Sequence, residues 1–95
     1  MDQVFERIAA VREHRGLAVD RVRSGELSLD GLFAEAAVDP VLSSAKILPF
    51  IEVIPEIGKV RSRRALAAAG IDEAALISAV DGVAHGRLGD ALDRA

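Results

Sequence analysis

Apolar residues recur at helical spacing along the first quarter of the chain, and arginines stand between them. This pattern predicts one amphipathic helix from about Asp2 to Ser24, weakened at Gly16. The apolar residues that recur are Val4, Ile8, Val11, Ala18 and Val22. Ser24 and Gly25 are expected to end this helix, because both residue types favour turns.

Cap signals place two short helices after the first one. Ser28 is suited to cap one of them, because its hydroxyl can accept a hydrogen bond from a free helical N–H. The inner face of that helix carries Leu29, Leu32, Phe33 and Ala36. Asp39 can cap the next helix, and Pro40 is tolerated at a first helical position, so this helix should run to Ser44 or Ala45.

The stretch 47–54 is the most apolar of the chain. Taken alone, residues 51–54 are also compatible with a strand. Because the neighbouring segments are helical and no partner strand is evident, we predict a buried short helix that ends at Pro55.

The remaining residues are predicted to be helical as well. A helix should open at Ile57 and Gly58 and run to about Ala69, with Gly70 at its C′ position. A short helix around Glu73–Val80, a turn at Asp81–Gly82 and a last helix to about Arg94 should follow. The predicted fold class is therefore all-α, with a long N-terminal helix (1–25) and a compact helical domain (26–95) in a single structural unit.

The composition excludes several classes of function. The chain of 95 residues has no cysteine, so disulfides and thiolate metal sites are excluded. No apolar run approaches the ~20 residues of a membrane span. The two histidines lack metal-ligand spacing and no nucleophile–base pair is evident, so we expect no cofactor, no metal and no enzymatic activity. We expect a cytoplasmic monomer.

Aromatic residues are scarce. The three phenylalanines, Phe5, Phe33 and Phe50, stand on apolar faces and are expected in the core. Sites for single-stranded nucleic acid and RNA loops stack bases on aromatic rings, so such ligands are not expected.

Charge is segregated along the chain, although the total is acidic. The net charge is −3 and the pI is near 5.3, which is low for a nucleic-acid-binding domain. Residues 57–71 nevertheless carry four cations and no acid, whereas residues 26–45 carry four acids and no cation. The cations are Lys59, Arg61, Arg63 and Arg64. The basic segment is therefore the candidate binding surface.

The basic segment begins at a hairpin between two predicted helices. One helix stops at Pro55, and the next begins with Gly58 in its first turn. The first N–H groups of a helix have no partner within it and the helix dipole is positive there, so a phosphate oxygen is a favoured ligand. Without a Cβ, Gly58 allows a sugar–phosphate chain to approach the backbone closely, and Lys59 can reach the same or the next phosphate.

The spacing assigns the four cations to two faces of the helix. Lys59 and Arg63 share one face, and Arg61 and Arg64 share another. The residues expected to turn inward are Ile57, Val60, Ala65 and Ala68. The DNA contacts predicted in the hairpin are Pro55, Ile57, Gly58, Lys59, Arg61, Arg63 and Arg64. Four cation–phosphate contacts predict that log K falls with log salt at a slope of about −3.6. An ordinary solvated corner between two helices contains the same residue types, and this alternative stays open.

The hairpin sequence is also the part of the chain that resembles a known family. Leu48 to Leu66, which ends Ile-Pro-Glu-Ile-Gly-Lys-Val-Arg-Ser-Arg-Arg-Ala-Leu, is similar to the core of the actinobacterial integration host factor family. A looser likeness covers most of the chain and includes Asp39–Leu42. Members are nucleoid-associated proteins. The resemblance implies a helix–two-turn–helix domain that binds double-stranded DNA with little sequence preference and can bend or compact it.

Two departures from the family pattern limit this transfer. The family's second hairpin is arginine-rich, whereas this chain has Leu76–Gly82 there, which leaves His85 and Arg87 as further phosphate contacts. The family is also basic overall. We therefore expect one strong contact surface instead of two, and weaker binding. The chain is then either a diverged acidic paralogue or a protein that relies on a partner for its second contact.

A protein-interaction module is the alternative function. Residues 26–45 form an acidic helical pair, and the first helix carries five arginines, so either segment is suited to a protein partner. Acids stand among these arginines, so we expect ion pairs within the helix and not an extension of the DNA surface. The expected partners are double-stranded DNA and, in the alternative, another protein; no membrane is expected.

Overall fold

The computed structural model describes the backbone of residues 2–94 and the side chains of residues 7–93. The elements are α1 (Asp2–Arg23), α2 (Leu29–Ala36), α3 (Pro40–Ser43), α4 (Leu48–Glu52), α5 (Gly58–Ala69), a 3₁₀ turn η1 (Ile77–Ala79) and α6 (Gly82–Arg94). No strand occurs in the described part of the chain, so the predicted all-α class is confirmed. Val4 and Phe5, both predicted to face inward, lie outside the described side chains.

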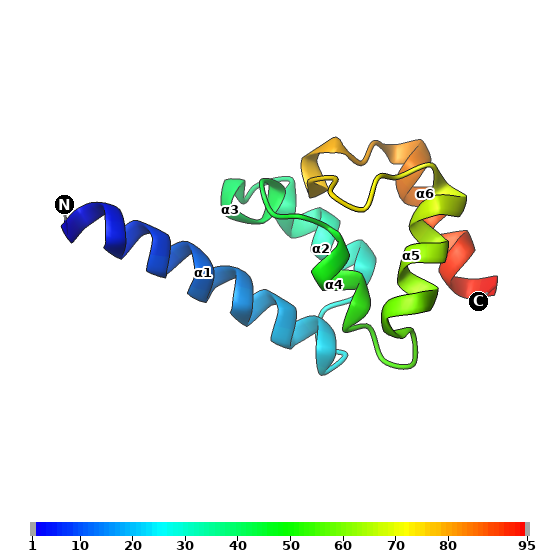
Figure 1. Ribbon diagram of the computed structural model, residues 1–95, viewed down its shortest axis with the longest axis horizontal. Helices are drawn as coiled ribbons and strands as arrows, with labels where there is room; N and C mark the ends of the chain where they lie inside the picture. Colours follow the sequence, from blue (N-terminus) through cyan, green and yellow to red (C-terminus); the bar gives the residue numbers. More distant parts are fainter. Residues whose placement is uncertain (1, 95) are drawn as a thin grey trace.

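Helix α1 packs on the body with its second half, and its first half projects away from the body (Figure 1). Ala18 and Val22 are buried in the same apolar cluster as the core residues of the other helices. Residues 7–10 are all exposed. Ile8, one of the apolar residues that recur in the predicted amphipathic helix, remains 47% exposed because this turn of α1 lies beyond the body.

The core is aliphatic and receives residues from every helix. Its largest fully buried side chains include Leu32, Leu42, Ile47, Ile51, Leu66 and Leu88. Phe50 is buried among them, as predicted, whereas Phe33 is half-buried at the edge of the cluster. Within the described residues, no helix is both long and apolar enough to cross a membrane.

The predicted caps are confirmed. The Ser28 hydroxyl accepts a hydrogen bond from the Gly31 N–H at 3.0 Å, and α2 begins at the next residue. Asp39 accepts hydrogen bonds from the N–H groups of Val41 and Leu42 at the start of α3. Gly70 ends α5 with a φ of 73°, in the left-handed region that favours glycine.

The prediction of a short helix around Glu73–Val80 is wrong. Only Ile77–Ala79 is helical, as a 3₁₀ turn, because the backbone on its N-terminal side bonds to a distant segment. The Ile47 N–H donates to the Ala75 carbonyl at 3.0 Å, and the Ile77 N–H donates to the Ala45 carbonyl at 2.9 Å. The predicted turn at Asp81–Gly82 is the start of α6, where Asp81 accepts a hydrogen bond from the Ala84 N–H.

Asp39 joins α1 to α3 through its carboxylate. Besides capping α3, its Oδ2 lies 2.6 Å from Nε2 of His14 on α1. The hydrogen bond from His14, supported by the two backbone N–H groups, holds the pKa of Asp39 below its ordinary value, against the opposing effect of desolvation. The ionised carboxylate is therefore the form that the fold favours.

This lowered pKa predicts an acid-sensitive contribution to stability. A carboxyl with a depressed folded-state pKa stabilises the fold above its unfolded pKa, and this stabilisation is lost as the pH falls through the folded value. Asp39→Asn is expected to lower stability at pH 7 and to flatten the fall in unfolding free energy below about pH 4. Urea unfolding from about pH 7 to pH 2 measures both effects. Asp90→Asn is the matched control, since Asp90 is exposed and has no hydrogen bond to a described residue. If the unfolding free energies of D39N and D90N change with pH in the same way, the proposed contribution of Asp39 to stability is wrong.

Candidate nucleic-acid interface

The turn between α4 and α5 has an unusual backbone. Helix α4 ends at Glu52, before the predicted stop at Pro55, and α5 begins at Gly58 as predicted. Both Glu56 and Gly58 have positive φ angles, of 71° and 72°. Glu56 is the one non-glycine residue with a positive φ in the described backbone. This conformation is costly for a residue with a Cβ, so contacts from the rest of the fold must hold it.

Gly58 is suited to its position for two reasons. Its φ of 72° favours glycine. Apart from its chain neighbours and the nearby backbone of its own helix, a Cβ added there would meet no atom within 4 Å, so the space in front of the backbone is open. The structure is thus consistent with the close approach of a ligand, and it adds a conformational reason for glycine that the sequence did not reveal.

The first turn of α5 is open to solvent and has no cap. Gly58, Lys59 and Val60 are all exposed, and no side chain accepts a hydrogen bond at this end of the helix. Helices α2, α3 and α6, in contrast, are capped by Ser28, Asp39 and Asp81. The first turn of α5 also contains no acid. Its N–H groups therefore form an uncompensated positive end.

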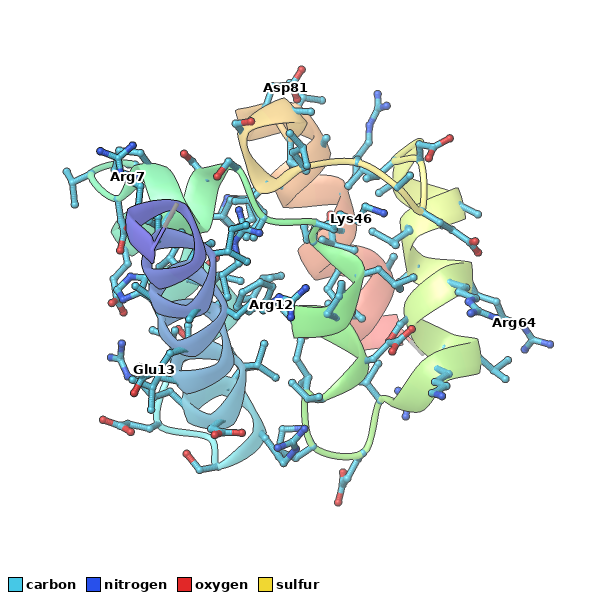
Figure 2. All side chains as sticks on the ribbon, turned by 60° about the vertical axis from the view of Figure 1, so that its left-hand side comes forward. Arg7, Arg12, Glu13, Lys46, Arg64 and Asp81 are labelled. Carbon is cyan, nitrogen blue, oxygen red and sulfur yellow. The ribbon has the colours of Figure 1, made fainter. Side chains whose placement is uncertain are left out.

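Three of the four cations lie on the exposed surface of α5. Lys59, Arg63 and Arg64 are exposed, and Figure 2 shows Arg64 extending away from the body. Lys59 and Arg64 have no ion pair with any described residue. Arg63 lies 3.7 Å from Glu73, but both side chains are more than half exposed, so this contact is weak and easily exchanged for a phosphate.

The buried face of α5 differs from the prediction. It carries Ser62, Ala65, Leu66 and Ala69, which follow one another at helical spacing. Val60 and Ala68 were predicted to turn inward, and this is wrong: Val60 is 64% exposed and Ala68 is exposed too, because the face that contacts the core lies on the other side of the helix. Ser62 was missed; its hydroxyl is buried and donates to the Gly58 carbonyl at 2.5 Å.

Arg61 differs from the other three cations. It is half-buried, and its Nη1 donates a hydrogen bond to the Glu56 carbonyl at 2.7 Å. Its Nε is buried without a partner among the described residues. The predicted pairing of Arg61 with Arg64 on one solvent face is therefore incomplete, since the Arg61 guanidinium turns back towards the hairpin.

Arginines of α1 are engaged with the body. Arg21 Nη1 lies 2.9 Å from Glu35 Oε1 on α2, and this hydrogen bond raises the pKa of Arg21 above its ordinary value. Arg15 donates to the Val41 carbonyl and to Ser44. Among the described side chains of α1, Arg23 and Asp20 form an ion pair within the helix, so the expectation is correct for that pair and wrong for Arg21. The guanidiniums of Arg15 and Arg21 thus hold α1 in place.

His85 and Arg87 lie away from the hairpin turn. Helices α5 and α6 run side by side in opposite directions, so the first half of α6 lies beside the end of α5 and not beside Gly58 (Figure 1). His85 Nε2 lies 2.8 Å from Asp30 Oδ1, and its ring stacks on Phe33 with centroids 4.1 Å apart. Arg87 is exposed. The structure therefore places His85 away from Gly58, and the DNA contacts of His85 and Arg87 stay a prediction.

The rest of the described structure offers no candidate metal site, and a shallow groove lies near the hairpin. Within residues 7–93, no group of three or more histidine, aspartate or glutamate side chains is placed to hold a metal ion. The half of α6 beside the hairpin helps to line a shallow apolar groove of about 410 Å³, whose walls include Ile54, Ile57 and Leu92 and whose polar residues include Asp30 and Asp93. These acids lie at the groove, and none is within ion-pair distance of a cation of α5.

Comparisons with known proteins point in one direction. No protein-family profile matches the chain. Two curated proteins, both named integration host factor, are 32% identical to it over 59 residues; one is from Mycolicibacterium smegmatis and the other from Mycobacterium tuberculosis. The similar segment covers 62% of this chain, and the chain spans only 56% of the length of either relative.

The fold has a solved counterpart over almost its whole length. The structure of a protein called sIHF, bound to an eight-base-pair palindromic DNA, superposes with a TM-score of 0.83 and covers 90% of this chain and 96% of that chain, at 24% identity. The all-helical arrangement described above is therefore that of sIHF. With the sequence similarity to the two mycobacterial proteins, this fold confirms the resemblance to the integration host factor family that was drawn from the hairpin sequence.

Proposed function

We propose that the chain binds the phosphate backbone of double-stranded DNA at the hairpin between α4 and α5. The observation that carries the proposal is the open first turn of α5, which has exposed N–H groups, no cap, and cations where acids are usual. Cations near the positive end of a helix dipole are unfavourable unless an anion binds between them. The contacts proposed are Pro55, Ile57, Gly58, Lys59, Arg63 and Arg64.

The similar proteins support this proposal. The sIHF structure holds DNA, and its fold matches that of this chain. Asparagine and glutamine, which read base edges through paired hydrogen bonds, are absent from the hairpin. Contacts to phosphates without base readout give binding that depends little on sequence, as expected of a nucleoid-associated protein.

The acidic net charge does not contradict DNA binding, because several acids are already paired. Glu35 forms an ion pair with Arg21, and Asp20 forms one with Arg23; Asp39 and Asp30 each make a hydrogen bond with a histidine. Lys59 and Arg64 have no such partner among the described residues. Unpaired cations are therefore available beside the first turn of α5, although the whole chain carries −3.

The salt dependence of binding tests the proposal. Three cation–phosphate contacts predict a slope of log K against log salt of about −2.7, and an affinity in the range ~10⁻⁴ to 10⁻⁶ M at physiological salt. Fluorescence anisotropy of a labelled duplex of random sequence, titrated at four or more salt concentrations, measures both quantities. The absence of binding at tens of micromolar protein in low salt would overturn the proposal.

One observation favours the second candidate function, which is contact with another protein. The face of α1 that buries Ala18 and Val22 continues towards the N-terminus through Val11 and the exposed Ile8, beyond the body. Exposed arginines flank this apolar stripe, and such a surface suits an acidic amphipathic helix of a partner. The titration above separates the two functions, because a chain that fails to bind duplex in low salt leaves this stripe as the candidate interface.

A further inference from the structure

The hairpin contains one strained residue and one cation that does not face solvent freely. Glu56 has a φ of 71°, a conformation that residues with a Cβ rarely adopt. The Glu56 carbonyl accepts a hydrogen bond of 2.7 Å from Nη1 of Arg61, one turn into α5. A charged donor makes this bond stronger than one between neutral groups. Arg61 is therefore hydrogen-bonded to the peptide group between Glu56 and Ile57, which directly follows the strained φ of Glu56.

A second bond holds the other end of the same turn. The buried hydroxyl of Ser62 donates to the carbonyl of Gly58, the second residue with a positive φ. Arg61 and Ser62 thus fix the two carbonyls that belong to the two left-handed residues. Between them, the Ile57 N–H donates to the Ile54 carbonyl at 3.1 Å, which provides an amide that reports on the turn.

The partial burial of Arg61 distinguishes it from the other three cations of α5. Its Nε is buried without a partner among the described residues, which is unfavourable for a group that had only to reach a phosphate in solvent. Lys59 and Arg64, in contrast, are exposed and have no ion pair in the described structure. The side chain of Arg61 therefore contacts the turn itself, whereas Lys59 and Arg64 remain available to a ligand.

We propose that Arg61 is a positioning residue: its guanidinium holds the Glu56 carbonyl, and with it the left-handed turn that exposes the first N–H groups of α5. The purpose of this contact rests on the proposed DNA-binding function, but the hydrogen bond from Arg61 to the Glu56 carbonyl is a property of the free protein. Lys59, Arg63 and Arg64 are then the cations that contact phosphates, and Arg61 acts on DNA only through the backbone that it fixes.

The test compares Arg61→Met in two backgrounds of equal charge. Glu56→Gln removes the carboxylate and keeps the backbone strain at this position. Glu56→Gly removes the carboxylate and the strain, because glycine adopts a positive φ without steric cost. Methionine keeps an apolar stem of similar length and has neither charge nor donor. The four proteins are E56Q, E56Q/R61M, E56G and E56G/R61M, and circular dichroism and thermal melting verify that each is folded.

The first measurement needs no DNA. Hydrogen exchange of the Ile57 amide is expected to accelerate about tenfold on R61M in the glutamine background, which corresponds to the loss of one hydrogen bond, and less than about threefold in the glycine background. Unchanged exchange of Ile57 in E56Q/R61M would overturn the proposal whatever happens to DNA binding. The result is independent of the proposed function, because the ligand is absent.

The second measurement separates a positioning residue from a phosphate contact. If Arg61 positions the turn, R61M in the glutamine background lowers duplex affinity about tenfold at every salt concentration and leaves the salt slope unchanged. A slope that becomes shallower by about 0.9 identifies Arg61 as a direct contact and overturns the proposal. If neither E56Q nor E56G binds duplex while Ile57 exchange still responds to R61M, the proposed DNA-binding function is wrong. The role of Arg61 in holding the turn is then still supported.

Discussion

Replacing Lys59 and Arg64 together by glutamate is expected to abolish duplex binding at salt concentrations where the unmodified chain binds. Both side chains are exposed beside the open first turn of α5, and neither has an ion pair with a described residue. The loss of two phosphate contacts makes the salt slope shallower by about 1.8, and the new carboxylates repel the backbone in addition. We expect affinity at about 50 mM salt to fall by roughly a hundredfold or more, measured by anisotropy with a labelled duplex.

The matched control changes the net charge by the same amount elsewhere. Arg7 and Arg12 lie on the projecting half of α1, are exposed and have no ion pair with a described residue. Arg7→Glu with Arg12→Glu is therefore expected to weaken binding only about two- to threefold, through long-range repulsion that salt screens. Equal losses in the two double variants would show that net charge governs binding, or that α1 contacts DNA, and the hairpin would lose its special role.

Leu66→Ala is expected to have the largest effect on stability. Leu66 lies on the inner face of α5, is 0% exposed and belongs to the common core. Truncation of a buried leucine costs about 2–5 kcal/mol, through lost burial and the cavity that remains. A domain of this size is stable by roughly 5–15 kcal/mol, so the variant should be greatly destabilised or partly unfolded.

The same substitution at an exposed position controls for helix propensity. Leu17 of α1 is 58% exposed, and Leu17→Ala should change the unfolding free energy by less than about 0.5 kcal/mol. Urea unfolding followed by circular dichroism measures both variants, and the expected difference between them is several times the error of the method. A Leu66→Ala chain as stable as Leu17→Ala would show that α5 is not packed as described.

Sequence signals that act over a few residues predicted the fold well. Ser28 and Asp39 were recognised as caps because the hydroxyl and the carboxylate reach N–H groups two or three residues further along the chain. Gly70 was recognised because a helix end there requires a positive φ. The boundaries of α1 and α5 follow from the same local rules. These elements were predictable because each signal and its partner lie within one turn of helix.

Predictions failed where a distant segment supplied the partner. Residues 72–76 are not helical because Ala75 and Ile77 bond to Ile47 and Ala45, about thirty positions away. Val60 was assigned to the core from apolarity alone, but the position of α6 and the body determines which face of α5 is buried. Hydrophobic periodicity in a short helix gives several acceptable faces, and only packing selects one of them.

Local sequence signals are enough to specify most of the helices, their caps, the hairpin and the four cations on its second helix. Which of those cations are available depends on the packing of the folded chain. Arg61 donates to the carbonyl of Glu56, Arg63 is weakly paired with Glu73, and Lys59 and Arg64 remain exposed. The reason is that caps and helix periodicity act along the chain, whereas the partner of a long charged side chain depends on which atoms folding brings within about 3 Å of it.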